Sequence, residues 1–248
     1  MLSLHHPSRV QLIERLKEQQ PIGVRSKRKI RSFVIRSGRT TIAQNRALVQ
    51  LLPKYANLTE IQECIENIRF TGNQVNIEIG LGDGKNLIHM AKEYPKDIFL
   101  GCDVHLPGIG STLNNLELHK IKNVRFLVGD VTVALLSFGR IFQNIYIFFP
   151  DPWPKKRHKK RRLINQAFFN LMSKKIKIDG KIYIATDCED YATSILDIIE
   201  TSEEVENCRG SRQFSKRPSW RLLTKFEKKA LQANSTVYEI CCVSKRID

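Results

Sequence analysis

Short apolar runs alternate with segments of helical periodicity along most of the chain beyond Asn73. Each apolar run is five or six residues long, which suits a short strand. The runs lie at Val75–Ile79, Ile98–Cys102, Val124–Val128, Asn144–Phe149 and Lys181–Ala185. The helical patterns lie at Asn86–Glu93, Ile109–His119, Val131–Phe138, Leu163–Lys175 and Tyr191–Thr201. This alternation predicts an α/β fold whose parallel strands are joined by right-handed crossovers.

Two more helices and one more strand are predicted on either side of this pattern. Ile42–Leu52 is typical of a helix that Pro53 ends, and residues 59–69 place three isoleucines on one helical face. Val237–Ser244 is predicted as a last strand after the loop-rich segment Gly210–Glu227. No repeat or linker interrupts the pattern, so one folded domain is expected.

The charge balance is strongly basic. The 248 residues include 41 Lys+Arg against 25 Asp+Glu, a formal net charge of +16. The excess is clustered between Arg25 and Arg46 and in residues 155–162, and neither stretch contains an acid. Clustered cations favour nucleic acid as the partner over an anionic membrane surface. We expect a basic, partly flexible arm over residues 1–40 and a single domain over residues 41–248.

A glycine-rich turn follows the first predicted strand. Gly80, Gly82 and Gly84 occupy alternate positions, where glycines allow a tight turn and let a ligand lie against bare backbone. The spacing G-x-G-x-G differs from the dinucleotide-binding G-x-G-x-x-G. Glu78, two residues earlier, would repel a pyrophosphate but attract an ammonium group. S-adenosylmethionine carries an ammonium, a cationic sulfonium and no phosphate, so it fits this turn.

Acids also end the next two predicted strands. Asp103 stands where an acid can accept hydrogen bonds from a ribose diol, and Asp130 stands where it could meet an adenine edge. Either acid could instead cap the helix that follows it. Because Glu78, Asp103 and Asp130 end three strands in succession, a nucleoside pocket is the better interpretation.

Residues 145–162 read IYIFFPDPWPKKRHKKRR. The strand places Asp151 and Trp153 at the carboxyl edge of the sheet, where α/β proteins bind their ligands. Trp153 either stacks on an RNA base or packs against its own proline-rich loop. The basic run is either a solvated helix start or a phosphate-binding surface, and its density beside the sheet edge favours phosphate contact.

These motifs together resemble those of the bacterial, single-subunit tRNA (guanine-N7)-methyltransferase family. The resemblance rests on EIGLGDG (78–84), GCDVHLPGIG (101–110), FFPDPWPKKRHKKRR (148–162), ATD (185–187) and LTKFE (223–227). It implies a Rossmann-like class I methyltransferase fold, with a mostly parallel seven-stranded sheet and helices on both faces. It also implies methyl transfer from S-adenosylmethionine to N7 of a guanine in the tRNA variable loop, at tRNA position 46.

The resemblance assigns site residues by motif. Asp151 corresponds to the position designated catalytic. The cofactor-contacting positions correspond to Glu78, Gly80, Gly82, Asp103, Asp130 and Asp151. The substrate-binding positions correspond to Lys155, Asp187, Thr224, Lys225, Phe226 and Glu227. No metal is implied.

Some of these residues allow a structural role as well. Asp187 could read the guanine edge or cap the helix that follows it. In the TKFE segment, Thr224 and Glu227 could bond to a base or ribose while Phe226 anchors the loop. Pro154 stands where the family often has histidine, so a direct role for side chain 154 is not expected.

Two other functions are compatible with the predicted fold class. A nicotinamide-dependent oxidoreductase would share it, but the glycine spacing and Glu78 disfavour that activity. A noncatalytic RNA-binding module would also share it, but the intact acids Glu78, Asp103, Asp151 and Asp187 disfavour the loss of catalysis.

The remaining reactive residue types suggest no further chemistry. The six cysteines show no CxxC spacing, so neither a zinc site nor a redox dithiol is expected, and the histidines show no metal-ligand spacing. No secretory signal and no apolar window of membrane-spanning length is visible. We therefore expect a cytoplasmic protein that binds tRNA and no membrane, and the sequence leaves a monomer and a homodimer open.

Overall fold

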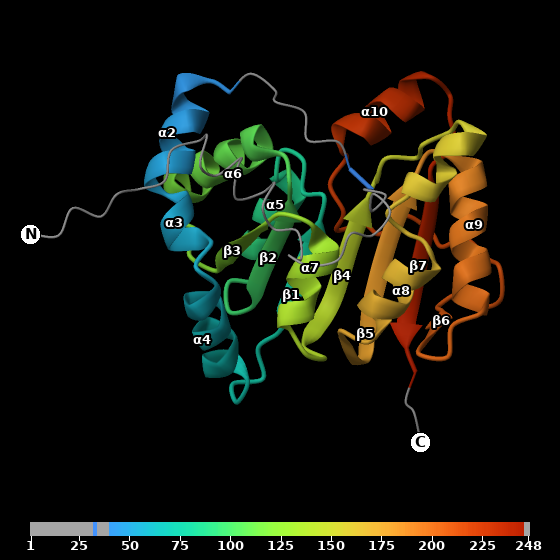
Figure 1. The fold of residues 1–248 in the computed structure, drawn as a ribbon, viewed down its shortest axis with the longest axis horizontal. Helices are drawn as coiled ribbons and strands as arrows, with labels where there is room; N and C mark the ends of the chain where they lie inside the picture. Colours follow the sequence, from blue (N-terminus) through green and yellow to red (C-terminus); the bar gives the residue numbers. More distant parts are fainter. Residues whose placement is uncertain (1–31, 34–39, 246–248) are drawn as a thin grey trace, which may run out of the picture. The chain divides into compact units, whose positions relative to one another are not determined.

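The computed structural model describes residues 32–33 and 40–245 (Figure 1). The basic arm predicted for residues 1–40 lies outside these ranges, apart from residues 32, 33 and 40. The boundary between that arm and a single domain therefore stays a prediction.

The described residues form a seven-stranded sheet with the strand order β3-β2-β1-β4-β5-β7-β6 (Figure 1). The strands are β1 (Val75–Ile79), β2 (Ile98–Asp103), β3 (Val124–Val128), β4 (Phe142–Phe148), β5 (Ile176–Thr186), β6 (Val205–Asn207) and β7 (Tyr238–Ser244). β4 pairs in parallel with β1 and β5, and β2 with β3, whereas β7 runs antiparallel to β5 and β6. The predicted mostly parallel α/β sheet is confirmed.

Helices alternate with these strands along the chain. In the described ranges the α-helices are α2 (Ile42–Gln50), α3 (Leu52–Tyr55), α4 (Leu58–Ile68), α5 (Lys85–Glu93), α6 (Leu106–Leu118), α7 (Val131–Ala134), α8 (Gln166–Ser173), α9 (Glu189–Glu200) and α10 (Lys225–Gln232). Two 3-10 helices are also present, η1 (Leu135–Ser137) and η2 (Lys156–Arg161).

Several segments differ from the sequence-based prediction. α2 already ends at Gln50, and Pro53 lies in the first turn of α3, where its missing N–H costs no helical hydrogen bond. The segment Gly210–Glu227 is not loop throughout, because α10 begins inside it. The strand β6 was not predicted, since three residues are too few to show a period.

The chain divides into two compact units. Within the described ranges, the first unit holds residues 40–74 and 80–134, and the second holds residues 32–33, 75–79 and 135–245. In the first unit α2 packs on α6, and α5 packs against β2. In the second unit α9 packs against β5, β6 and β7.

In the second unit, an aromatic cluster covers one face of β4. Tyr146 and Phe148 share this face, whereas Ile145 points to the other one, and all three side chains are buried. Tyr146 lies opposite Tyr183 of β5, and the two rings stack with centroids 5.6 Å apart. The Trp220 ring meets Tyr146 and Tyr183 at centroid distances of 5.4 and 5.1 Å. The segment that precedes α10 is thereby anchored on the sheet.

Candidate active site

The glycine turn that follows β1 belongs to the first unit. Gly80 and Gly82 have φ angles of +78° and +58°, which L side chains rarely adopt. A Cβ atom added to either glycine would meet nothing within 4 Å. The N–H of Gly80 donates to the carbonyl oxygen of Cys102 in β2 at 2.8 Å, which fixes the turn beside that strand. The turn therefore leaves its backbone open, and a ligand there stays a prediction.

Helix α6 approaches the same turn at Gly108. A Cβ atom at Gly108 would lie 1.9 Å from the carbonyl oxygen of Gly82, so a larger residue here must displace the turn. The hydroxyl of Thr112 donates to the carbonyl oxygen of Gly108 at 2.9 Å, and a Cβ atom at Gly84 would collide with this Thr112 side chain. Close helix packing thus holds the turn in one conformation.

Asp103, at the end of β2, completes the turn. One carboxylate oxygen accepts from the N–H of Gly82 at 3.2 Å, and the other accepts from the N–H of His105 at 2.9 Å. Two of the predicted cofactor residues, Gly82 and Asp103, are thus brought together within the first unit.

Asp130, after β3, makes the contacts of a helix cap. Its Oδ1 accepts from the N–H and the hydroxyl of Thr132 at 2.9 and 2.7 Å. Its carbonyl oxygen accepts from the N–H groups of Val133 and Ala134, both at 3.0 Å, as α7 begins. Oδ1 of Asp130 therefore caps the helix, which was the alternative role. A contact between Asp130 and adenine stays a prediction.

Glu78 and Asp151 belong to the second unit. Glu78 is buried in β1, with a relative exposure of 4%, and lies opposite Tyr146 of β4 in the parallel register. Asp151 follows the end of β4 by three residues and is exposed. Because parallel strands end at the same edge of a sheet, both acids lie toward the carboxyl edge.

The chain turns sharply between β4 and the basic run. Phe149 and Trp153 have φ angles of +52° and +42°, and such left-handed positions cost about 1 kcal/mol each for residues with a side chain. The N–H of Phe149 donates to the carbonyl oxygen of Ala185 at 2.8 Å, which extends the pairing of β4 with β5. This strained turn presents Asp151 to solvent.

The basic run ends in a buried arginine. Arg162 has a relative exposure of 5%, and its Nε donates to the carbonyl oxygen of Pro152 at 2.9 Å. The guanidinium also pairs with Asp190 of α9 at 2.5 Å and lies over the Tyr191 ring, 4.6 Å from its centroid. Arg162 thus ties the loop that carries Asp151 to α9.

The other cations of the run have different environments. Nζ of Lys159 pairs with Asp190 at 2.6 Å, and the hydrogen bonds from Lys159 and Arg162 lower the pKa of that carboxyl group. The guanidinium of Arg161 lies over the Trp153 ring, 5.0 Å from its centroid. Four cations of the run are exposed: Lys155, Lys156, Arg157 and Lys160.

Trp153 is held by its own surroundings. The indole N–H donates to the carbonyl oxygen of Ser32 at 3.4 Å, and the ring meets His158 edge-on at a centroid distance of 5.9 Å. Partial burial, followed by the charges of neighbouring cations, lowers the pKa of His158 below its ordinary value. The geometry favours the alternative in which Trp153 packs against its own loop.

Asp187 lies exposed at the bend between β5 and α9. The N-cap residue of α9 is Cys188, and no side chain caps this helix. Helix capping therefore does not account for Asp187, and substrate contact stays the prediction for it.

The TKFE segment forms the start of α10. Thr224 is the N-cap, and its hydroxyl accepts from the N–H of Glu227 at 3.0 Å. Phe226 is 60% exposed and stacks on Phe149 with centroids 6.3 Å apart and planes at 20°. Glu227 is only 2% exposed. The ring expected to anchor the segment is thus largely exposed but stacked on Phe149, and the acid expected to contact a base or ribose is buried.

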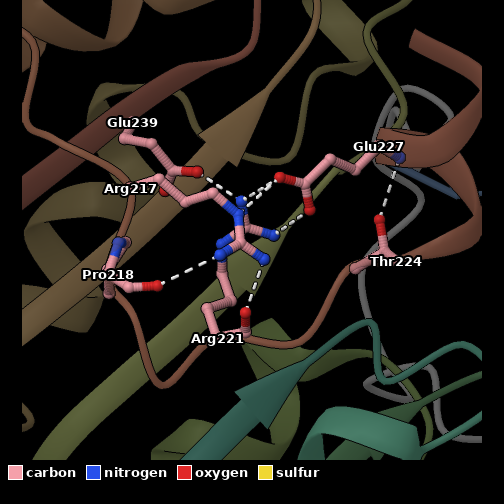
Figure 2. A network of polar contacts seen from close by, with 6 residues as sticks. All are labelled: Arg217, Pro218, Arg221, Thr224, Glu227 and Glu239. Carbon is pink, nitrogen blue, oxygen red and sulfur yellow. Dashed lines mark hydrogen bonds and ion pairs between the residues drawn. The ribbon is translucent and has the colours of Figure 1, made fainter. Parts of the chain in front are cut away.

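Figure 2 shows the charged cluster that surrounds Glu227. Arg221 is fully buried, donates to the two carboxylate oxygens of Glu227 at 2.7 and 2.8 Å, and also bonds to Glu239 of β7. Nε of Arg217 adds a contact of 2.7 Å to Glu227. Two cations therefore meet two carboxylates.

The pKa values of the two carboxyl groups in this cluster are shifted in opposite directions. Burial raises the pKa of Glu227, but hydrogen bonds and charges from Arg221 and Arg217 outweigh it, so the net shift is downward. Burial dominates at Glu239, and its pKa is raised. Glu227 is thus the carboxylate that the arginines stabilise most clearly.

Arg221 also reaches the end of β4. Its guanidinium carbon lies 5.3 Å from the centroid of the Phe148 ring and 5.8 Å from that of Phe149. The cluster therefore connects α10 and β7 with the turn that precedes Asp151. Sequence reasoning missed Arg221; the available signal is a cation inside the apolar run WRLL, residues 220–223.

Within residues 32–33 and 40–245, no group of three or more His, Cys, Asp or Glu side chains could hold a metal ion. Over the same part of the chain, no helix has the length and apolar character needed to cross a membrane.

Comparison with known proteins identifies the family. Residues 72–240 match a family described as "Putative methyltransferase". The tRNA (guanine-N(7)-)-methyltransferase of Nitrosomonas europaea is 39% identical over 85% of this chain and 95% of that protein. The chain belongs to the tRNA (guanine-N7)-methyltransferase family. Relatives of the same name from Buchnera aphidicola and Methylococcus capsulatus are both 38% identical over 86% of this chain, and over 90% and 93% of their own lengths.

Solved methyltransferase structures share the fold. A 30S ribosomal A1408 methyltransferase from an uncultured bacterium gives a TM-score of 0.57 at 16% identity, over 77% of this chain and 95% of that chain. The antibiotic-resistance methyltransferase Kmr gives 0.53 at 11% identity, over 77% and 93%. The Rossmann-like class I fold is confirmed, and membership of a methyltransferase family displaces the oxidoreductase and noncatalytic hypotheses.

Replacing Gly108 by alanine tests the packing of α6 on the glycine turn. Gly108→Ala should destabilise this methyltransferase by about 2 kcal/mol, because the new methyl group overlaps the Gly82 carbonyl oxygen. It should also weaken binding of S-adenosylhomocysteine, measured by calorimetry. Gly139→Ala is the matched control, since a Cβ there meets nothing within 4 Å. Equal Tm values and equal affinities for the two variants would contradict the packing argument.

Replacing Glu227 by glutamine tests the charged cluster. Glu227→Gln should lower the free energy of unfolding by about 3 kcal/mol at pH 7, because two arginines lose a buried partner. The folded pKa of Glu227 lies below its ordinary value of 4.5, so its contribution is present above that pH and is lost as pH falls further.

The gap between wild type and Glu227→Gln in urea unfolding should therefore shrink below about pH 4.5. Glu206→Gln, at an exposed position of β6, is the control and should stay within about 0.5 kcal/mol of wild type. A pH-independent gap would show that Glu227 is not the stabilised carboxylate.

Proposed function

We propose that the enzyme transfers the methyl group of S-adenosylmethionine to N7 of guanine 46 in the variable loop of tRNA. The observation that carries this proposal is the 38–39% identity with tRNA (guanine-N(7)-)-methyltransferases over 85–86% of the chain. Within each unit, the acids that follow the strands support it, as does the basic run that follows β4 in the second unit.

The donor is assigned to the glycine turn and the strand-end acids. Open space beside Gly80 and Gly82 suits a ligand that lies against the backbone, and Asp103 is held where it can accept from a ribose. Asp130 is assigned to the adenine. Glu78 and Asp151 are assigned to the cationic part of the donor, since a pyrophosphate would be repelled there. When bound, S-adenosylmethionine supplies a methyl group activated by its sulfonium.

The reaction does not require the protein to transfer a proton. Guanine N7 has an in-plane lone pair and no proton at neutral pH, so no general base is required. The demands are alignment of N7 with the methyl group and exclusion of water. We assign Asp151 to accept from N1–H or the N2 amine of the guanine. There it fixes the base and offsets the positive charge that spreads onto the purine.

The tRNA backbone is assigned to the exposed part of the basic run. Lys155, Lys156, Arg157 and Lys160 face solvent, whereas Lys159 and Arg162 already pair with Asp190. Asp187, Thr224 and Lys225 are assigned to the substrate near the acceptor guanine, and Phe226 supplies an exposed ring on which a base can stack. Glu227 supports this substrate site indirectly, because its contacts with Arg221 hold α10 in place.

Incubation of the purified chain with labelled methyl donor and unmodified tRNA tests the activity. The expected product is 7-methylguanosine at position 46, detected by borohydride–aniline cleavage, with none on a transcript that carries adenine there. Asp151→Asn should lower kcat by roughly tenfold to a hundredfold, because base positioning and charge compensation are both lost. Cleavage at another guanine would overturn the assigned position, and full turnover of Asp151→Asn would overturn its role.

The salt dependence of tRNA binding tests the phosphate-contacting surface. Replacing Lys155, Lys156, Arg157 and Lys160 by glutamine should reduce the slope of log K against log salt by roughly 3, at 0.7–0.9 per lost phosphate contact. The control replaces Lys92, Lys96, Lys120 and Lys122, exposed lysines that precede β2 and β3 at the opposite ends of the strands. An equal change in both quadruple variants would mean that net charge alone, and not this surface, governs binding.

A further inference from the structure

Two cysteines that are distant in sequence lie side by side at the β6 edge of the sheet. β6 and β7 pair antiparallel, with Asn207 opposite Cys242, so the next step of the register places Cys208 opposite Cys241. The N–H of Cys208 donates to the carbonyl oxygen of Cys241 at 2.9 Å, and the two sulfur atoms are also 2.9 Å apart. The absence of a CxxC motif therefore concealed a dithiol.

The backbone at this pair already fits a disulfide. Opposed residues of antiparallel strands have Cα atoms about 4.5–5.5 Å apart and side chains on the same face. Disulfides span Cα separations of about 4.4–6.8 Å. Joining Cys208 to Cys241 therefore requires rotation of side chains and no movement of strands.

The two thiols differ in exposure and in acidity. Cys208 is exposed beyond the end of the edge strand, and Cys241 is half-buried in β7. The hydrogen bond with Cys241, aided by the charge of Lys181, lowers the pKa of Cys208 to about 7 despite partial burial. The same hydrogen bond and burial raise the pKa of Cys241. Cys208 is thus the accessible thiolate, and Cys241 stays a thiol beside it.

The other thiols in the described residues lack this combination. Cys102 and Cys242 are fully buried, and burial raises the pKa of both. Cys64 accepts a hydrogen bond from Arg125 at 3.4 Å, and Cys188 is half-buried before α9.

We propose that Cys208 and Cys241 form a reversible intramolecular disulfide when the protein meets a hydroperoxide. The Cys208 thiolate attacks one peroxide oxygen, the O–O bond breaks, and the departing oxygen takes a proton and leaves as water or an alcohol. Cys208 is then a sulfenic acid. The Cys241 sulfur attacks it, the S–O bond breaks, and the hydroxide leaves with the thiol proton as water. Two thiols are oxidised to one disulfide, and one peroxide is reduced.

The bond would form two residues along β7 from Glu239, a member of the charged cluster described above. Cys241 lies two residues from Glu239 in β7, and their side chains share a face of the strand. A disulfide to Cys208 would thus join the edge of the sheet to the strand that supports Arg221. This modification does not depend on the proposed tRNA activity and is tested without it.

Treatment of the purified full chain with hydrogen peroxide tests the proposal. The intact mass should fall by two hydrogen atoms, and non-reducing peptide mapping should show one bridge, between Cys208 and Cys241. Dithiothreitol should reverse both changes. Cys208→Ser and Cys241→Ser should abolish the bridge, whereas the matched variants Cys64→Ser and Cys188→Ser should retain it. In Cys241→Ser, dimedone should trap the sulfenic acid on Cys208.

Six free thiols after treatment, a bridge between another pair, or a disulfide between two copies of the chain would each overturn the proposal. Irreversible sulfinic acid on Cys208 in the wild type would do the same, because it means that Cys241 does not reach the intermediate in time. A further contrary result would be that dimedone labels Cys241 in Cys208→Ser and leaves Cys208 unlabelled in Cys241→Ser. That result would contradict the assignment of Cys208 as the thiol that attacks the peroxide.

Discussion

One buried guanidinium organises the carboxyl edge of the second unit. Arg221 is fully buried, and a charge taken out of water is tolerated only when it is paired with good geometry. Glu227 supplies two carboxylate contacts and Glu239 supplies a third, so α10 and β7 are held to the same group. Because Glu227 must point inward to meet Arg221, the preceding residue, Phe226, is turned about 100° away and faces solvent. The exposed ring is thus a consequence of the buried ion pair.

The loop after β4 is also held by a buried arginine. Arg162 is buried against Tyr191, holds the carbonyl oxygen of Pro152 and pairs with Asp190. The planar guanidinium suits this role because it can bond to a carbonyl and a carboxylate in different directions while it stacks on a ring. Lysine could not make these contacts together. Two arginines of a strongly basic chain therefore fix the two segments that flank the sheet edge, while the cations that precede Arg162 at positions 155, 156, 157 and 160 stay exposed.

Local patterns in the sequence predicted most strands and helices of the fold but not the side-chain pairs that join distant segments. Val75–Ile79 and Val124–Val128 match β1 and β3, because a short apolar run bounded by polar residues is visible in a single window. β5 begins five residues earlier than predicted, since Asp179, with φ of +61°, and Gly180 hide its first half. Pairings such as Arg162 with Asp190 and Cys208 with Cys241 join segments 28 and 33 residues apart, and no local period reports them.

The chemistry assigned to the site makes such supporting residues as important as those that touch the substrate. Methyl transfer to a ring nitrogen that already has a lone pair gives the protein no proton to move, so its contribution is geometric. Motif membership cannot separate contact from support: in TKFE, Phe226 faces solvent while Glu227 is 2% exposed and bonded to two arginines. Loss of Glu227 should therefore act through the position of α10. A defect in turnover at that residue, with donor binding retained, would reflect displaced neighbours and would not require a contact with RNA.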